Sequence, residues 1–270
     1  MKTGAILLLF AGTATAALAP SESRASTITL PGATYTGAID TSVGIPGVGT
    51  TSTHAGVNHP GTTSGGISPY VSASVTILDG LVPSMDSSLS ISSVPSGFGY
   101  RTSAGVTASM QFSMEIVGAN GSVPVFVQAS GGYNPNHGGA AGLEVENEVS
   151  RLTIFGAYAL GDAEYHSSGN SITPPFSIAG DYSLSANTLY TVELYTQLDV
   201  SISGASGGGA ATATAFVDPT FRVDAPGYSL VFSPGIGPSI AATPIPATLP
   251  LLVSALSGLG FAGWWRKRAA

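Results

Sequence analysis

The chain lacks cysteine, which excludes disulfide bonds, thiol catalysis and zinc sites built from cysteine ligands. Charged residues are also scarce, at 9% of the 270 residues, whereas an average globular protein has about 25%. Between Ser26 and Trp265 there is no lysine, and three arginines against 14 acidic residues give a formal charge of −11. Because this field would repel a phosphate backbone, we expect no nucleic-acid partner.

The first 25 residues have the composition of a signal peptide. Lys2 precedes an apolar, small-residue stretch, residues 4–19, of the length of a signal-peptide core. Cleavage after Ala19 would leave a proline directly after the cut, so cleavage after Ala25 is favoured. An uncleaved N-terminal anchor is the alternative, although this stretch is short for a spanning helix.

The body of the chain carries the alternation of β-strands. Every second residue from Val106 to Ile116 is apolar, and Asn120-Gly121 then supplies the residues of a tight turn before the alternation resumes at Val123. A second long strand is expected at 188–203, with its apolar residues on one face. Shorter strands are expected at 71–78, 143–149, 151–158 and 227–233.

No segment between residues 26 and 240 has helical periodicity. We therefore predict an all-β fold, an antiparallel β-sandwich of jelly-roll-like type, over residues 71–240. Residues 26–70 are expected to form a Gly/Thr-rich, partly irregular region. Within it, residues 41–70 have too little apolar content to pack well and predict a long surface excursion or a poorly ordered segment.

Catalytic motifs are weak. Gly204 to Gly208 fit the G-x-S-x-G pattern of serine hydrolases, but that turn requires a following helix, and an Ala/Thr-rich strand follows here. The four histidines, at positions 54, 59, 137 and 166, have no metal-like spacing. We therefore expect no catalytic residues, no enzyme activity and no cofactor.

Carboxylates give only weak candidates for calcium. Glu144, Glu146 and Glu148 alternate with apolar residues, which predicts that they share one face of a strand. Such a row most simply marks a solvated face, although converging carboxylates can also bind calcium. No metal site is predicted, and the weak calcium candidates are Glu146, Asp218 and Asp224.

Sugar binding is the stronger alternative for the body. Sandwich modules hold saccharides by stacking them on exposed aromatic rings, and both tryptophans of this chain lie in its tail. Tyr133 and Tyr195 are the candidate ligand-binding residues. The competing interpretation is that these rings pack in the core or at a sheet edge.

The sequence of the tail predicts a membrane-spanning helix. Residues 249–265 carry no charge and would span about 26 Å as a helix, close to the hydrocarbon thickness of about 30 Å. Trp264 and Trp265 suit the membrane interface, and Arg266, Lys267 and Arg268 would stay on the cytoplasmic side.

The order of features in residues 243–270 resembles the PEP-CTERM sorting signal, in its VPLPA-type variant. The short element is Thr243 followed by Pro244, Ile245, Pro246 and Ala247, and the apolar stretch and basic cluster come after it. Threonine replaces the usual valine, isoleucine replaces leucine, and the glutamate of Pro-Glu-Pro is absent. These differences affect the subtype of the signal.

The resemblance implies export by a Gram-negative bacterium, with signal peptidase and the export machinery as partners. The precursor would be held transiently in the inner membrane, cut near the Pro-x-Pro-Ala element by an exosortase, and released to the cell surface or the extracellular matrix. A permanent anchor is the alternative for the tail.

Two functions remain open. The first is a non-catalytic structural role in the exopolysaccharide or biofilm matrix. The second is a carbohydrate-binding β-sandwich module or a weak glycan-acting enzyme, with exopolysaccharide as the partner.

Overall fold

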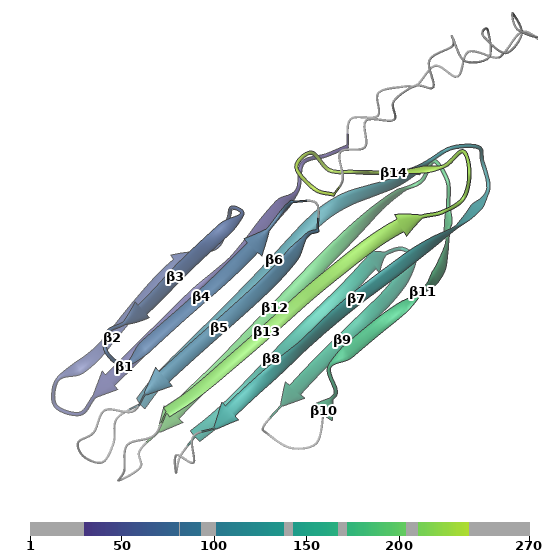
Figure 1. The fold of residues 1–270 in the computed structure, drawn as a ribbon. Coiled ribbons are helices and arrows are strands. Elements are labelled where there is room, and N and C mark those ends of the chain that lie inside the picture. Colours follow the sequence, from purple (N-terminus) through teal and green to yellow (C-terminus); the bar gives the residue numbers. More distant parts are fainter. Residues whose placement is uncertain are drawn as a thin grey trace, which may run out of the picture.

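The structure is a computed structural model, and it describes residues 30–80, 82–92, 101–137, 143–166, 172–203 and 210–237. This part of the chain contains fourteen strands and no helix, and every strand pairing in it is antiparallel (Figure 1). The prediction of an all-β antiparallel fold is confirmed.

Eight strands form one sheet, called sheet A. Its order is β10-β9-β8-β12-β6-β1-β2. The remaining strand, β14, pairs with residues 114–117 of β6, which follow the residues of β6 that pair with β1. The strands are β1 (Thr34–Ile45), β2 (Gly49–Gly56), β6 (Arg101–Val117), β8 (Leu143–Phe155), β9 (Tyr158–His166), β10 (Ile172–Thr173), β12 (Leu189–Ser203) and β14 (Ser229–Phe232).

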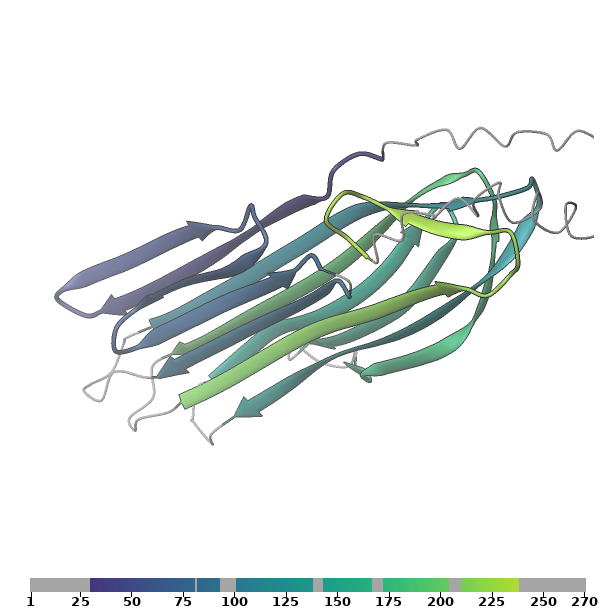
Figure 2. The same ribbon diagram turned by 45° about the horizontal axis from the view of Figure 1, so that its top comes forward.

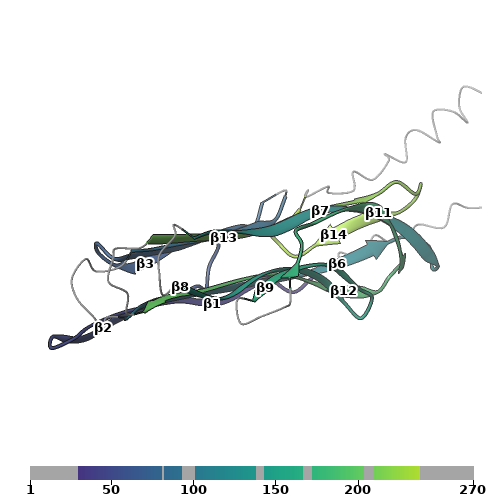
Figure 3. The same ribbon diagram turned by 90° about the horizontal axis from the view of Figure 1, so that it is seen from below.

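Six strands form the second sheet, called sheet B, in the order β11-β7-β13-β5-β4-β3. The strands are β3 (Gly61–Ile67), β4 (Val71–Leu78), β5 (Ser84–Ser92), β7 (Ser122–His137), β11 (Phe176–Ser185) and β13 (Ala210–Val223). Seen edge-on, the two sheets form two layers, and the strands of both run along the long axis of the molecule (Figures 2 and 3).

Alternation along the strands explains the two layers. On β6 every even-numbered residue from Thr102 to Ile116 is buried, and on β12 every even-numbered residue from Tyr190 to Ile202 is buried. These side chains meet the buried faces of β4, β5, β7 and β13 in one contiguous core. Burial of apolar area at about 25 cal/mol per Å² is therefore the main stabilising term.

Buried hydroxyl groups form hydrogen bonds across the core between the sheets. The hydroxyls of Ser87 on β5 and Thr196 on β12 lie 2.7 Å apart, and both side chains are buried. Ser150 on β8 donates to the carbonyl of Gly132 on β7 at 2.7 Å. Because a buried hydroxyl without a partner costs free energy, these bonds favour one alignment of the two sheets.

The N-terminal region differs from its prediction. Residues 41–70, expected as an excursion or a poorly ordered segment, contain the end of β1 and the whole of β2 and β3. Their low apolar content is explained by position, because β2 and β3 are edge strands whose residues are mostly exposed. Both sheets therefore begin before residue 71.

Two other connections also differ. The strands predicted at 143–149 and 151–158 are largely one strand, β8. The turn at Asn120-Gly121 leads from β6 in sheet A to β7 in sheet B, so it joins the layers instead of closing a hairpin within one sheet. The buried alternation from Val123 onward is nevertheless as expected.

The two ends of the described body lie together at one end of the sandwich (Figure 1). Ser233 donates its hydroxyl to the carbonyl of Pro31 at 2.6 Å, and its Oγ accepts from the amide of Ser113 at 2.7 Å. Leu30 and Gly237, the first and last described residues, therefore both lie at this end.

The edge of the sandwich that lies farthest from β2 is covered by Phe176 on β11. A side chain added at Gly131 on β7 or at Gly161 on β9 would overlap the Phe176 ring. The ring is thus held between two glycines, one from each sheet, where no larger residue fits.

We predict that Gly131→Ala lowers the free energy of unfolding by about 1–3 kcal/mol, because the clamped ring has no room to move away. The measurement is urea denaturation. Gly180→Ala is the matched control, since it lies on β11 with no atom within 4 Å of an added Cβ. Equal stability of the two variants would contradict the packing described here.

Candidate functional site

A hollow of about 530 Å³ lies on the outer face of sheet A. Its lining comes from four adjacent strands, β1, β2, β6 and β12, and it is rich in hydroxyl and charged groups. The volume falls in the range of about 300–1,000 Å³ typical of small-molecule sites. A second hollow on sheet B has a similar volume, about 570 Å³, so the charged side chains of the first hollow make it the candidate binding site.

Gly105, which has no side chain, forms part of the lining of the hollow. In the ladder of sheet A, Gly105 on β6 pairs with Asp40 on one side and Asp199 on the other. A Cβ built at Gly105 would lie 2.8 Å from Oδ1 of Asp199, so this carboxylate extends over the glycine. Two carboxylates thus border one gap in the side-chain surface.

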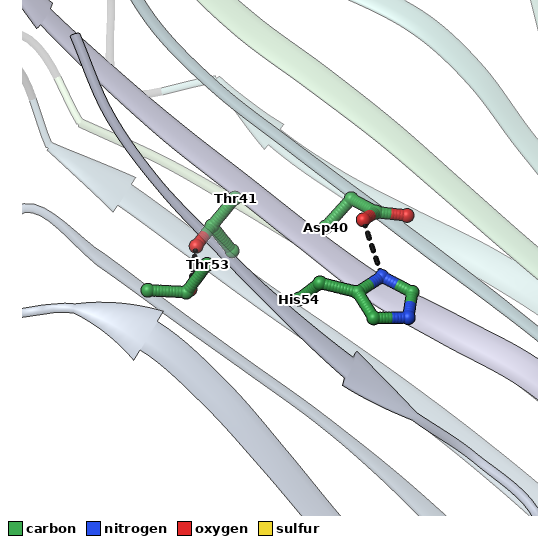
Figure 4. Close-up of polar contacts among 4 residues, drawn as sticks. All are labelled: Asp40, Thr41, Thr53 and His54. Carbon is green, nitrogen blue, oxygen red and sulfur yellow. Dashed lines mark hydrogen bonds and ion pairs between the residues drawn. The ribbon is translucent and has the colours of Figure 1, made fainter.

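Asp40 and His54 form the best-defined polar pair at the hollow. Nδ1 of His54 on β2 lies 2.7 Å from Oδ1 of Asp40 on β1, and both side chains are 66% exposed. Figure 4 shows the two side chains pointing toward one another, beside the hydrogen-bonded pair Thr41 and Thr53. Cross-strand pairing brings these residues together, since Asp40 is directly opposite His54 in the register.

A chain of hydrogen bonds runs along β12 toward the hollow. The hydroxyl of Tyr195 donates to Oε1 of Gln197 at 2.7 Å, and Nε2 of Gln197 donates to Oδ2 of Asp199 at 2.6 Å. Burial raises the pKa of Tyr195, an effect that the nearby Arg151 opposes. The tyrosine hydroxyl therefore stays protonated and able to donate at neutral pH.

Tyr195 and Tyr133, the two predicted ligand-binding residues, are not brought together. Tyr195 is half-buried on the outer face of sheet A, with the guanidinium of Arg151 6.0 Å from its ring centre. Tyr133 on β7 of sheet B pairs with Ala215, whose side chain is buried, so it belongs to the inward-facing row. Neither residue lines the hollow, and Tyr195 is connected to its lining only through Gln197 and Asp199.

The weak calcium candidates also lie apart. Asp224 forms an ion pair with Arg222 at 2.8 Å. Burial raises the pKa of Asp86, and the negative charge of nearby Asp218 adds to this effect. Across the described ranges, no three histidine, aspartate or glutamate residues are grouped so that they could hold a metal ion.

The prediction that Glu144, Glu146 and Glu148 share one solvated face is wrong. Asn147 pairs with Asp199 and Val145 with Val200, so Glu146 is the extra residue of a β-bulge. After the bulge, the even-numbered residues of β8 face inward instead of outward. Glu148 therefore pairs with Leu198, which belongs to the inward-facing row of β12. Its side chain is fully buried, and neither carboxylate oxygen has a hydrogen-bond partner among the described residues.

Several predicted features lie outside the described residues. They are the signal peptide, the Gly204–Gly208 motif, the sorting element Pro244–Ala247 and the tail with Trp264, Trp265, Arg266, Lys267 and Arg268. Among the residues that the structure does describe, there is no helix of the length and apolarity needed to cross a membrane.

Comparison with protein-family models and with curated proteins gives no match. The fold class and the hollow are therefore the structural basis for any functional argument.

The sequence interpretation missed the residues that make the hollow. Asp40, His54, Gly105 and Asp199 are spread over 160 positions, and none belongs to a recognisable motif. One local signal was available, because Pro46-Gly47 between two Thr-rich segments predicts a hairpin that would face Asp40 toward His54. Nothing local predicts that β6 and β12 lie side by side.

Glu148 should make stability depend on pH. Burial raises its pKa from 4.5 to about 7, so between these values the folded protein holds a proton that the unfolded chain releases. The free energy of unfolding should therefore fall as pH rises from about 4.5 to about 7, by up to about 3 kcal/mol, and this contribution stays lost above pH 7.

We predict that Glu148→Gln removes this part of the pH dependence and is more stable than the unmodified protein at pH 8. Denaturation at pH 5 and pH 8 measures it. Glu115→Gln, on the outer face of β6, is the control and should retain the original slope. An unchanged slope in Glu148→Gln would show that Glu148 is not the titrating group.

Proposed function

We propose that this chain is an exported bacterial surface or matrix protein with a non-catalytic structural role in the exopolysaccharide or biofilm matrix. The observation that carries the proposal is the order of features at the C-terminus: the element Thr243–Ala247, an uncharged apolar stretch, and then Arg266, Lys267 and Arg268. An exosortase would cut the precursor near this element after its transient retention in the inner membrane.

The arrangement of the body supports this proposal. Both ends of the described chain lie at the same end of the sandwich, near Ser113, whereas the hollow lies at the Arg101–Gly105 end of β6. At about 3.4 Å per residue these two regions are roughly 30 Å apart along the strand. A precursor held by its tail would thus present the hollow away from the membrane.

The proposal includes three further features of the architecture. We propose a jelly-roll-like connection of the two sheets, an N-terminal signal helix that is removed during export, and a single C-terminal transmembrane helix over about residues 249–265. The uncharged run from Ala225 to Trp265 supports the last of these.

Intact-mass analysis of the protein recovered from the producing cell tests the sorting proposal. We expect a mature product that begins at Ser26 or Pro20 and ends near Ala247, because signal peptidase and exosortase each remove one apolar segment. Replacing Pro244 and Pro246 with alanine should leave the precursor in the membrane. A mature product ending at Ala270 would instead show a permanent anchor.

A second candidate function is saccharide binding at the hollow. The observation that favours it is the pair of carboxylates, Asp40 and Asp199, that line an open gap, with Tyr195 and Gln197 joined to Asp199 by hydrogen bonds along β12. Sugars present many hydroxyls, which such groups can bind in directed pairs, and a half-exposed tyrosine ring adds a stacking surface.

We predict that Gly105→Ala weakens binding to the extracellular polysaccharide of the producing cell at least several-fold, since the added Cβ fills the gap beside Asp199. Calorimetry with the purified protein measures the affinity. Tyr195→Ala should also weaken binding. Gly56→Ala is the control, because no atom lies within 4 Å of a Cβ added there.

Retained binding in Gly105→Ala, or binding lost equally in Gly56→Ala, would rule out the hollow as the site. If the unmodified protein binds no polysaccharide, saccharide binding is excluded as a function, and the structural role in the matrix is unaffected.

A further inference from the structure

The strand β2 is an edge strand without the usual protection. It has eight residues, pairs with β1 on one side only within the described chain, and keeps an uninterrupted register from Gly49 to Gly56. Natural edges are usually blunted by proline, by charged residues, by a bulge or by short length. β2 has no proline, lysine, arginine or acidic residue, and it has no bulge.

The free edge carries a regular row of backbone donors and acceptors. The amide of Val57 donates to the carbonyl of Gly37 at 3.0 Å, which makes these two residues a hydrogen-bonded pair of the β1–β2 register. Antiparallel ladders alternate bonded and non-bonded pairs. The amides and carbonyls of Thr50, Ser52 and His54 therefore point away from β1, toward the open edge.

Two of the other edges are better protected. β10 has only two residues. β11 carries the exposed Asp181, and its Ser183 carbonyl accepts a hydrogen bond from the hydroxyl of Tyr158. Within the described residues, β2 is thus a long edge of sheet A that is open to another strand.

Charge distribution indicates which partner suits this edge. No Asp, Glu, Lys or Arg occurs from Thr41 to Leu78, the segment that contains β2, β3 and β4. The far side of the sandwich carries Asp162 and Glu164 on β9 and Asp181 on β11. Two copies of this acidic body repel each other least when their uncharged sides meet.

We infer that β2 is a self-association surface, on which a second copy of this chain adds its own β2 in antiparallel orientation. Such a contact is isologous, since the same strand is used by both copies, and it closes as a dimer. Sheet A then continues from one copy into the other. The backbone groups of Thr50, Ser52 and His54 gain partners that the described residues of one copy do not supply. This inference is independent of how the tail is sorted.

The absence of cysteine makes the contact testable by site-specific cross-linking of the full chain in mild detergent. Ser52→Cys places a single thiol on the open edge, and a short bis-maleimide joins it only to a second copy. We expect a covalent dimer from Ser52→Cys. Ser177→Cys, on the β11 edge, is the matched control and should give little dimer.

A charge introduced at the edge should block the contact. Thr50→Lys combined with Ser52→Cys is expected to lower the dimer yield at least several-fold, because it places a lysine on the joining strand of each copy, at an edge that otherwise has no charged residue. Ser90→Lys combined with Ser52→Cys is the control, since Ser90 is exposed on the central strand β5 of sheet B. Melting temperatures of both variants verify that the fold is kept.

Three results would overturn the inference. The first is no dimer from Ser52→Cys, and the second is equal dimer yield with Thr50→Lys in a folded protein. The third is cross-linking of Ser52→Cys to Ser177→Cys in a mixture of the two variants, which would show head-to-tail association instead.

Discussion

The pairing of β6 with β12 is the constraint on which the rest of the structure depends. Fifteen residue pairs join these strands without interruption, from Arg101 opposite Ser203 to Glu115 opposite Leu189. One face of the pair is apolar and must be covered, and sheet B covers it. The opposite face is left open to solvent, and there the same register sets Asp199 beside Gly105. The core and the hollow therefore arise from one strand pairing.

The interior is not uniformly apolar, and its polar groups fall into two kinds. Ser87, Thr196 and Ser150 find partners across the gap between the sheets, so their burial is compensated. Glu148 has no such partner, and its burial favours the neutral acid. The β-bulge at Glu146 is the cause, because one extra residue moves the following carboxylate from the outer face to the inner one.

Charge is distributed unevenly over the surface, and this asymmetry connects the hollow with the open edge. Asp40 and His54 lie where the uncharged side of the sandwich meets the acidic outer face of sheet A. β2 contributes both to the hollow, through His54 and Ser52, and to the edge, through the backbone of the same residues. A second strand added at this edge would border the hollow, so occupancy of one surface would affect the other.

Local sequence patterns determined much of the fold. The alternation at 106–116 and 188–203 predicted β6 and β12 and their buried faces, because side-chain direction in a strand depends only on parity. Residues 41–70 were misread because an edge strand buries few side chains, so its sequence resembles a loop. Only the tertiary structure decided that Gly105 lies between Asp40 and Asp199 and that Glu148 is buried. The physical reason is that strand order and bulges depend on contacts between residues far apart in the chain, which no local pattern records.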